Sequence, residues 1–220
     1  ELYRRGRENG VPELRLLTGE EARALEPGLN PDVQGALLAP TAAIVSPWEY
    51  CLALAETAVQ NGVRLHLDSA VTGIEKIPSG YRITASGQTY ETRYILNAAG
   101  VHADHIHNMI APPAFRVRPR KGEYYLLDKS EGSQVGRVIF PCPTMAGKGV
   151  LVAPTVHGNL IVGPNSFPAS DGEDPATTLS GLQEVASKAR RTVPEVDLRA
   201  CIRTFAGVRA VGERLASVPG

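Results

Sequence analysis

The sequence is poor in cysteine, in aromatic residues and in net charge. Its three cysteines lie far apart with no C-x-x-C pair, which argues against a disulfide framework or a zinc site and favours reduced, buried thiols in a cytoplasmic protein. Basic and acidic residues each number 23, so the chain lacks the basic surface typical of nucleic-acid binding. No apolar run approaches the roughly 20 residues that span a bilayer.

Four further features are missing. The chain begins at Glu1 rather than at methionine, has no signal-peptide pattern at its start, and stops at residues 217–220 without a closing element. We therefore expect a piece of a larger protein. There is also no Gly-x-Gly-x-x-Gly motif, the turn that holds a pyrophosphate group at a helix N-terminus.

The order of helical and strand patterns indicates an α+β fold. With 220 residues and 43% apolar content, the chain can build one large or two small domains. Most predicted strands follow one another closely, so we expect antiparallel pairing, with a meander over residues 71–97 and a hairpin turn at 157–159. The patterns predict helices over residues 1–9, 18–25, 47–61 and 174–193 and strands over residues 14–17, 35–45, 63–67, 71–77, 81–85, 90–98, 115–128, 137–140, 149–155, 160–163 and 200–209.

The strongest helix start lies at residues 46–49. Ser46 can cap the helix, Pro47 suits its first position, and Glu49 completes a capping box. We expect Trp48 and Tyr50 to pack in a core. The residues at helical spacing that predict a buried face are Trp48, Cys51, Leu52, Ala55, Ala58 and Val59. For the helix over 174–193, the inward residues are Leu179, Leu182, Val185, Ala186 and Ala189.

Residues 94–100 combine an apolar run with small residues. Tyr94 to Leu96 fit a short buried strand, and Ala98, Ala99 and Gly100 then leave the backbone open to close approach. A tight strand-to-helix turn packed on a neighbouring element is the alternative. The histidines that follow, at 102, 105 and 107, do not share one helix face, so we expect no metal site there.

Segments spread over nearly the whole chain resemble the glycine/D-amino-acid oxidase-like FAD family. This family includes glycerol-3-phosphate dehydrogenases and L-2-hydroxyglutarate oxidases. The motif Asn97-Ala98-Ala99-Gly100 is similar to its second flavin-proximal strand. The other matching segments are residues 44–63, 71–74, 120–125, 149–165 and 205–209.

The resemblance implies a mostly antiparallel substrate-binding sheet flanked by helices, plus part of an α/β FAD-binding domain. Residues 1–46 and 113–211 would form the substrate-binding domain, residues 47–112 a remnant of the FAD-binding domain, and residues 212–220 a truncated tail. FAD is the implied cofactor of the full-length protein. Since the glycine-rich turn and the family's C-terminal flavin segment are absent, we expect this chain to bind FAD poorly or not at all.

The resemblance also assigns candidate site residues. Arg209 is the expected ligand of a small anion, because a planar guanidinium binds such groups with paired donors. Lys121 supplies a second positive charge or belongs, with its arginine neighbours, to a solvated basic strand edge. Tyr124 lines the flavin face or packs in the core. The residues expected to meet FAD are Val71, Ala98, Ala99 and Gly100.

The implied reaction is hydride transfer to flavin from a small anionic hydroxy compound, first of all glycerol 3-phosphate, yielding dihydroxyacetone phosphate. L-2-hydroxyglutarate oxidation is the alternative, and a non-catalytic binding module is the second class for the isolated chain. The electron acceptor would be a quinone or oxygen, and peripheral association of the full-length protein with a membrane is compatible with the resemblance. No residue stands out as a general base. His157, in the predicted hairpin turn, is expected to face solvent.

Overall fold

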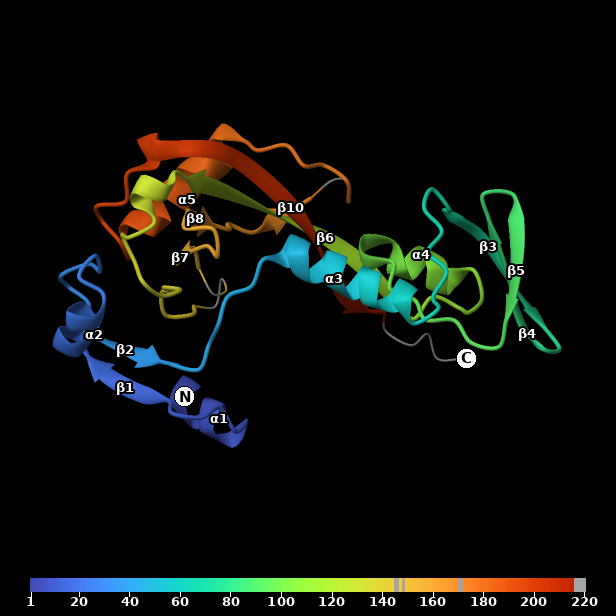
Figure 1. The fold of residues 1–220 in the computed structure, drawn as a ribbon, viewed down its shortest axis with the longest axis horizontal. Helices are drawn as coiled ribbons and strands as arrows, with labels where there is room; N and C mark the ends of the chain where they lie inside the picture. The colour runs from blue at the N-terminus through green and yellow to red at the C-terminus, as the bar shows by residue number, and fades with distance from the viewer. Residues whose placement is uncertain (145–146, 148, 170–171, 216–220) are drawn as a thin grey trace. The chain divides into compact units, whose positions relative to one another are not determined.

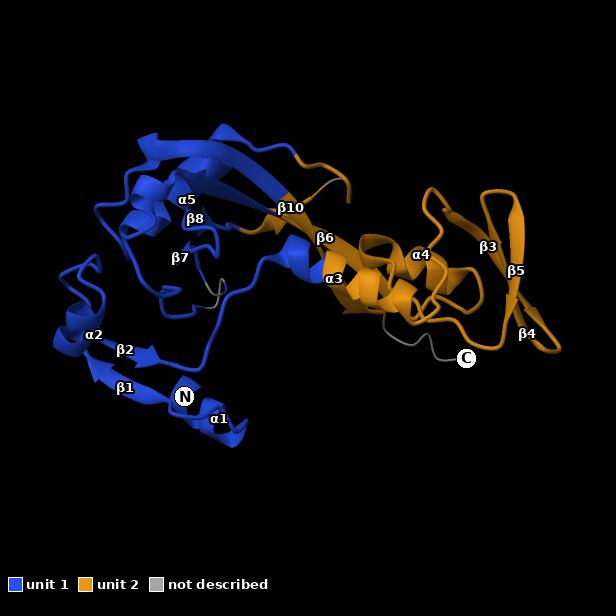
Figure 2. Ribbon diagram, viewed as in Figure 1, with its two compact units in different colours: residues 1–51, 122–165, 176–206 blue, residues 52–121, 166–175, 207–220 orange. Residues whose placement is uncertain are grey.

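The structure is a computed structural model that describes residues 1–144, 147, 149–169 and 172–215, arranged in two compact units (Figures 1 and 2). Unit 1 comprises residues 1–51, 122–165 and 176–206, and unit 2 comprises residues 52–121, 166–175 and 207–220. The domain boundaries inferred from the sequence stay a prediction. Of the tail predicted over 212–220, residues 216–220 lie outside the described residues.

A five-stranded sheet confirms the antiparallel α+β prediction. Its strand order is β10 (Cys201–Arg214), β6 (Phe115–Leu127), β8 (Leu160–Gly163) and β7 (Leu151–Pro154), with β9 (Phe167–Pro168) pairing with β6. The pairs β6–β8, β6–β9 and β7–β8 are antiparallel. β7 and β8 form the predicted hairpin, and His157 in its turn is exposed as expected. Short 3-10 helices at Lys129–Glu131 and Leu198–Ala200 flank the sheet strands.

The main core lies in unit 1, where helix α5 (Leu179–Arg190) packs on β8. Val185 and Ala189 are buried as predicted, but Leu179 is exposed. The helix begins at Leu179 behind its cap Thr178, not at residue 174, so Leu179 lies in a first turn that faces solvent. The core cluster contains Leu127, Val135, Val150, Val152, Leu160, Val162, Val185, Ala189, Val193 and Val196.

The first forty residues add a small second layer to unit 1. Helix α1 (Leu2–Glu8) precedes β1 (Arg15–Thr18), helix α2 (Gly19–Leu25) and β2 (Gly35–Leu38), and β1 pairs antiparallel with β2. The helix start predicted at Thr18 is confirmed, and a capping box forms there, since Thr18 Oγ1 accepts from Glu21 N at 3.2 Å and Glu21 Oε2 accepts from Thr18 N at 2.8 Å. Leu17, Ala22 and Leu29 form the small core of this layer.

Unit 2 contains the predicted meander of β3 (Val71–Ile77), β4 (Gly80–Ala85) and β5 (Gln88–Thr92). A 3-10 turn at Gly100–His102 then leads into helix α4 (Ala103–Asn108). Asp104 joins this helix to β6, because its carboxylate accepts hydrogen bonds from Val117 N and His105 N, both at 2.9 Å. Both bonds favour the charged form, that to Val117 most, and lower the pKa of Asp104 below its ordinary value.

The predicted buried face of helix α3 (Pro47–Gln60) is wrong. The helix has no buried residue, Trp48 is 76% exposed, and Tyr50 is exposed as well. At its start Ser46 Oγ accepts from Glu49 N at 3.4 Å. Helical spacing identifies residues that share a face, but a second element must cover that face, and the described part of the chain supplies none.

Two predicted strands are also wrong for a related reason. Residues 63–67 and 94–98 have no strand structure, and Tyr94 and Leu96 are exposed, Leu96 by 93%. A strand requires neighbouring backbone donors and acceptors, and no described segment pairs with these two. The strand predicted over 137–140 shrinks to one bridge between Ile139 and Val152.

The three cysteines are free, as the sequence predicted. Their predicted burial is wrong, because Cys51 and Cys142 are exposed and Cys201 is only partly buried. Cys51 lies on the uncovered helix α3, so its exposure has the same cause as that of Trp48. None of the described helices combines the length and apolar character needed to cross a membrane.

Candidate functional site

Lys121 is buried in unit 2 although lysine usually lies at the surface. It is 3% exposed, and its ammonium donates to Asp174 Oδ2 at 2.5 Å. The ring of Phe167, on the paired strand β9, lies 5.7 Å from the same nitrogen. The alternative of a solvated basic edge is therefore wrong for Lys121, whereas Arg116 and Arg118 on the same strand are exposed.

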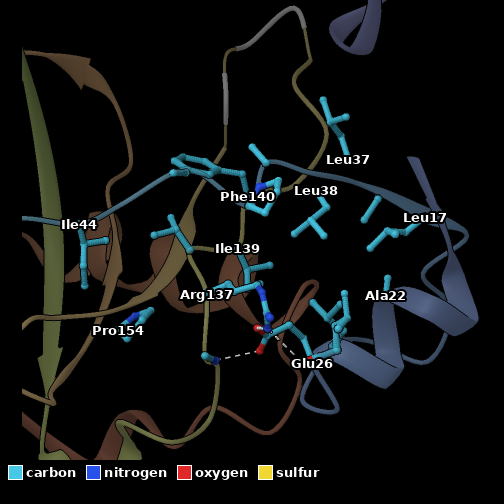
Figure 3. A pocket seen from close by; sticks show the side chains of 18 of the residues that line it. Leu17, Ala22, Glu26, Leu37, Leu38, Ile44, Arg137, Ile139, Phe140 and Pro154 are labelled. Atoms are coloured by element: carbon cyan, nitrogen blue, oxygen red, sulfur yellow. Dashed lines mark hydrogen bonds and ion pairs between the residues drawn. The ribbon is translucent and has the colours of Figure 1, made fainter. Parts of the chain in front are cut away.

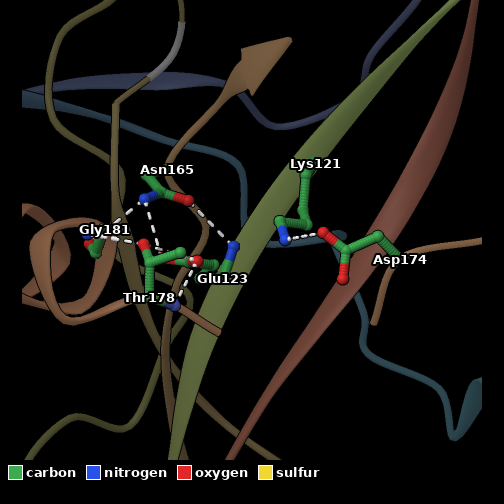
Figure 4. A network of polar contacts seen from close by, with 6 residues as sticks. All are labelled: Lys121, Glu123, Asn165, Asp174, Thr178 and Gly181. Atoms are coloured by element: carbon green, nitrogen blue, oxygen red, sulfur yellow. Dashed lines mark hydrogen bonds and ion pairs between the residues drawn. The ribbon is translucent and has the colours of Figure 1, made fainter. Parts of the chain in front are cut away.

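Two residues further along β6, in unit 1, Glu123 is completely buried and fully hydrogen-bonded (Figure 4). Its Oε1 accepts from Thr178 N at 2.7 Å and from Thr178 Oγ1 at 3.0 Å, and its Oε2 accepts from Asn165 Nδ2 at 3.4 Å. The amide of Asn165 also donates to Gly181 O at 3.1 Å and accepts from Glu123 N at 2.8 Å. One carboxylate thus connects β6, the segment after β8 and the start of α5.

Tyr124 follows Glu123 and stacks on Phe205 of β10, with ring centres 4.9 Å apart and planes within 8° of parallel. β10 is the hydrogen-bonded neighbour of β6, and it carries Arg209 four residues beyond Phe205. Arg209 is exposed. The structure thus places Tyr124 and Lys121 on one strand and Arg209 on the next strand of the same sheet, with no substrate role assigned to them by geometry alone.

The loop predicted to approach FAD, residues 97–100, is built from small residues and leaves open space at Gly100. Asn97 shapes it, with Nδ2 donating to Ala103 O at 2.8 Å and Oδ1 accepting from Ala99 N at 3.2 Å. Gly100 has a φ of +55°, and a side chain built there would meet nothing within 4 Å. Ala98 is exposed and Ala99 partly buried. Small side chains, with free space above the backbone at Gly100, fit a loop that a flat cofactor approaches closely.

Val71, the other predicted FAD contact, begins β3 opposite Ala85, and the register shifts between Val71 and Gly73. It is partly exposed at the end of the sheet. The residues present therefore fit one side of an FAD site. They do not include a glycine-rich turn for the pyrophosphate group, because the sequence has none.

A cavity of about 520 Å³ lies within unit 1 between the small β1–β2 layer and residues 136–140 (Figure 3). Its walls are mainly apolar, with Leu17, Leu38 and Ile139 among them. Glu26 and Arg137 form an ion pair at its side, at 2.8 Å, and Glu26 also accepts from Gly136 N at 2.8 Å. None of the site residues predicted from the sequence lines this cavity.

The histidine-rich turn does not assemble a metal site among the described residues. His102 Nε2 lies 3.4 Å from Glu173 Oε1, and the rings of His102 and His105 are 5.9 Å apart. His107 instead packs against Phe115, with ring centres 5.1 Å apart. These contacts connect the turn to its own unit.

Sequence reasoning missed the polar partners of β6. Glu123 was detectable, because counting back in steps of two from the buried Leu127 places residues 125, 123 and 121 on the same strand face. A glutamate at such a position requires hydrogen-bond donors. Asn165, Thr178 and Asp174 gave no comparable signal, because they come from irregular segments distant in sequence.

Comparison with known proteins identifies the family. The family model described as "FAD dependent oxidoreductase" (DAO) matches residues 1–219. The chain is 47% identical over 213 residues to glycerol 3-phosphate dehydrogenase of Caloramator mitchellensis, covering 97% of this chain and 44% of that protein. It is 30% identical over 169 residues to L-2-hydroxyglutarate dehydrogenase of Escherichia coli, covering 75% of this chain and 39% of that protein.

Among solved structures, dithionite-reduced L-alpha-glycerophosphate oxidase of Mycoplasma pneumoniae with FAD bound is similar to this chain. The TM-score is 0.87 at 27% identity, and the match covers 96% of this chain and 57% of that one. The chain thus spans about half the length of the relatives that it matches. The family model, the sequence relatives and the fold agree, and the chain belongs to the DAO family of FAD-dependent oxidoreductases.

Proposed function

We propose that the full-length protein carrying this chain is a flavoprotein that oxidises glycerol 3-phosphate to dihydroxyacetone phosphate. The observation that carries the proposal is the 47% identity to a glycerol 3-phosphate dehydrogenase over 97% of the chain. The match to an L-2-hydroxyglutarate dehydrogenase, at 30% over 75%, supports the second candidate substrate less strongly. Both candidates are small anionic alcohols.

In this proposal the chain supplies the substrate-binding domain and part of the FAD-binding domain. When bound, FAD supplies the acceptor for the hydride that leaves the carbinol carbon. Gly100 leaves open space above its backbone on the cofactor side, and Ala98 and Ala99 beside it carry only methyl side chains. The apolar residues of α3 and of residues 94–96 are exposed in this chain. In the proposal they belong to the predicted FAD-binding domain, and the rest of the full-length protein covers them.

Arg209 binds the phosphate of the substrate in this proposal. Its exposure on β10 makes the guanidinium accessible to a ligand, and guanidinium groups bind phosphate with two parallel donors. Lys121 adds positive charge that Asp174 partly neutralises. Tyr124 provides a flat wall, because its ring is held parallel to that of Phe205. The hydroxyl proton passes to a base that we do not assign among the described residues.

Steady-state kinetics of the full-length protein test the proposal. We expect glycerol 3-phosphate to be oxidised with a kcat/KM well above that for L-2-hydroxyglutarate. Arg209→Ala should lower kcat/KM about 100-fold, because removing one partner of a close charge pair costs about 2–5 kcal/mol. Arg203→Ala is the matched control, since Arg203 is also an exposed arginine of β10. Preferential oxidation of L-2-hydroxyglutarate would replace the first candidate with the second.

The electron acceptor in this proposal is either oxygen or a quinone. Formation of hydrogen peroxide at the rate of substrate oxidation identifies oxygen as the acceptor. Reduction of a soluble quinone without peroxide identifies a quinone, and binding to lipid vesicles then tests peripheral membrane association. The cytoplasmic location is supported by the three free cysteines, two of them exposed.

A further inference from the structure

The backbone pairing of β6 with β8 and β9, on the side of the strand away from β10, is interrupted at Glu123. Tyr125 pairs with Val162 of β8, and Lys121 pairs with Phe167 of β9. Between these pairs the partner chain leaves the ladder, because β8 ends at Gly163 and β9 begins at Phe167. Glu123 N therefore has no strand partner, and Asn165 Oδ1 accepts its hydrogen bond at 2.8 Å instead.

The Glu123 side chain makes a second attachment at the same point. Its carboxylate accepts from the backbone N–H and the hydroxyl of Thr178, the N-cap residue of α5. Together with Asn165, it replaces ladder hydrogen bonds by side-chain bonds to two other segments. A completely buried carboxylate with three such bonds is rigid, because moving it would leave buried polar groups unpaired.

Close packing against β8 and α5 fixes the same stretch of β6. A side chain built at Gly163 would meet Glu123 O at 2.6 Å and Tyr124 Cδ1 at 2.8 Å. A side chain built at Gly181 would overlap the Glu123 carboxylate. The two glycines thus allow β8 and α5 to approach β6 where Tyr124 begins its stack on Phe205.

We propose that Glu123 is a positioning residue, which through Asn165 and Thr178 holds β6 so that the Tyr124 ring is presented to the substrate. The proposal rests on the proposed function in assigning Tyr124 to the substrate wall. Glu123 itself does not touch the substrate, since it is completely buried. Its effect on the reaction passes through the backbone of the next residue.

Glu123→Gln is the direct test, because glutamine keeps the shape but directs N–H donors at the Asn165 amide, where the carboxylate accepted. Glu26→Gln is the matched control. Glu26 is also a buried glutamate of unit 1 that accepts a backbone N–H, but it lies at the cavity beside Arg137, away from β6. Both variants are made in the full-length flavoprotein, and their flavin content and melting temperature are measured first.

For Glu123→Gln we expect the KM for the oxidised substrate to rise at least tenfold while flavin content stays at the wild-type level. Glu26→Gln should leave KM unchanged even if it lowers the melting temperature equally. Asn165→Ala should also raise KM, as Glu123→Gln does. Unchanged KM in Glu123→Gln, or equal changes in both glutamine variants, would overturn the proposal.

Amide hydrogen exchange provides a readout that does not depend on the substrate. Over residues 122–126, exchange should accelerate at least tenfold in Glu123→Gln and remain unchanged in Glu26→Gln. If glycerol 3-phosphate is not oxidised by the wild type, the proposed function fails, and this exchange comparison still decides whether Glu123 fixes β6. Wild-type exchange at residues 122–126 in Glu123→Gln would reject the positioning role whatever the substrate is.

Discussion

Unit 1 and unit 2 contain the same kind of apolar periodicity, but only unit 1 buries it. Among the described residues, every buried apolar side chain except Ala85 lies in unit 1. There, α5 covers one face of the sheet, and Val185 and Ala189 meet Leu160 and Val162 in a continuous core. In unit 2, residues such as Tyr94 and Leu96 follow equally apolar patterns and face solvent.

The difference shows that apolar periodicity specifies which residues share a face of a helix or strand. Whether that face is buried depends on a second element that packs on it. Unit 1 brings both the sheet and its helix from this chain. In unit 2, buried polar residues connect the elements: Asp104 joins α4 to β6 by a hydrogen bond, and Lys121 is paired with Asp174. Large exposed apolar surfaces mark places where another segment binds. The proposed function assigns that cover to the rest of the full-length protein.

The largest expected effect comes from truncating one leucine in each unit. Leu160→Ala should lower the free energy of unfolding of this chain by about 2–5 kcal/mol, because Leu160 is completely buried in the core. Leu96→Ala should change it by less than about 0.5 kcal/mol, because Leu96 is almost completely exposed. Urea unfolding of both variants measures the contrast. Equal losses would mean that unit 2 has a core of its own.

A second comparison uses one glycine from each unit. Gly181→Ala should cost about 1–3 kcal/mol, because the new methyl group would overlap the Glu123 carboxylate. Gly207→Ala, on β10 in unit 2, should be nearly neutral, because nothing lies within 4 Å of a side chain built there. Thermal unfolding of the two variants checks the order. A destabilised Gly207→Ala would show that β10 is covered at this point.

A substitution at Asp104 tests whether buried polar contacts stabilise unit 2. Asp104→Asn should lower stability at neutral pH by about 1.5 kcal/mol, because two backbone N–H groups lose a charged acceptor. The folded-state pKa of Asp104 lies below its ordinary value of 3.8, so its contribution is present above that pH and is lost as the pH falls through the lowered pKa.

The wild type should therefore lose stability below about pH 4 more steeply than Asp104→Asn. Unfolding measured across this range in both proteins gives the two pH profiles. If the stability of the two proteins changed with pH in parallel, a charged Asp104 would not be what connects α4 to β6. Asp197, whose pKa is lowered to about 2 chiefly by its hydrogen bond with Arg199, titrates equally in both proteins and cancels in the comparison.

The smallest expected effect concerns helix caps. Thr18→Ala should cost about 1 kcal/mol, because both halves of the α2 capping box are formed. Ser46→Ala at the uncovered helix α3 should cost less, because Ser46 accepts one long bond of 3.4 Å. Chemical denaturation of the two variants ranks them. A larger loss at Ser46 would contradict the view that α3 is weakly held in this chain.

Much of the fold was predictable where local signals agree with their surroundings. The Thr18 capping box, the meander over residues 71–97, the β7–β8 hairpin and the long strand β6 all follow from short-range patterns. The wrong predictions concern Trp48, residues 63–67 and residues 94–98, where burial depends on a partner element that sequence periodicity does not reveal.

The candidate site was predictable in its family-specific positions but not in its polar contacts. Arg209, Lys121 and Tyr124 were selected from a resemblance, and their roles stay predictions. The pairing of Lys121 with Asp174, and of Glu123 with Thr178, joins residues that lie over fifty positions apart in sequence, at separations of 53 and 55. No local pattern encodes such contacts, because they form only when irregular segments return to β6.

Anaerobic titration of the full-length flavoprotein tests the central claim most directly. One equivalent of glycerol 3-phosphate should bleach the flavin absorbance and yield dihydroxyacetone phosphate, and Arg209→Ala should require far more substrate than Arg203→Ala. Bleaching by L-2-hydroxyglutarate alone would assign the chain to the second candidate. A full-length protein that contains FAD and is reduced by neither compound would contradict the proposed function.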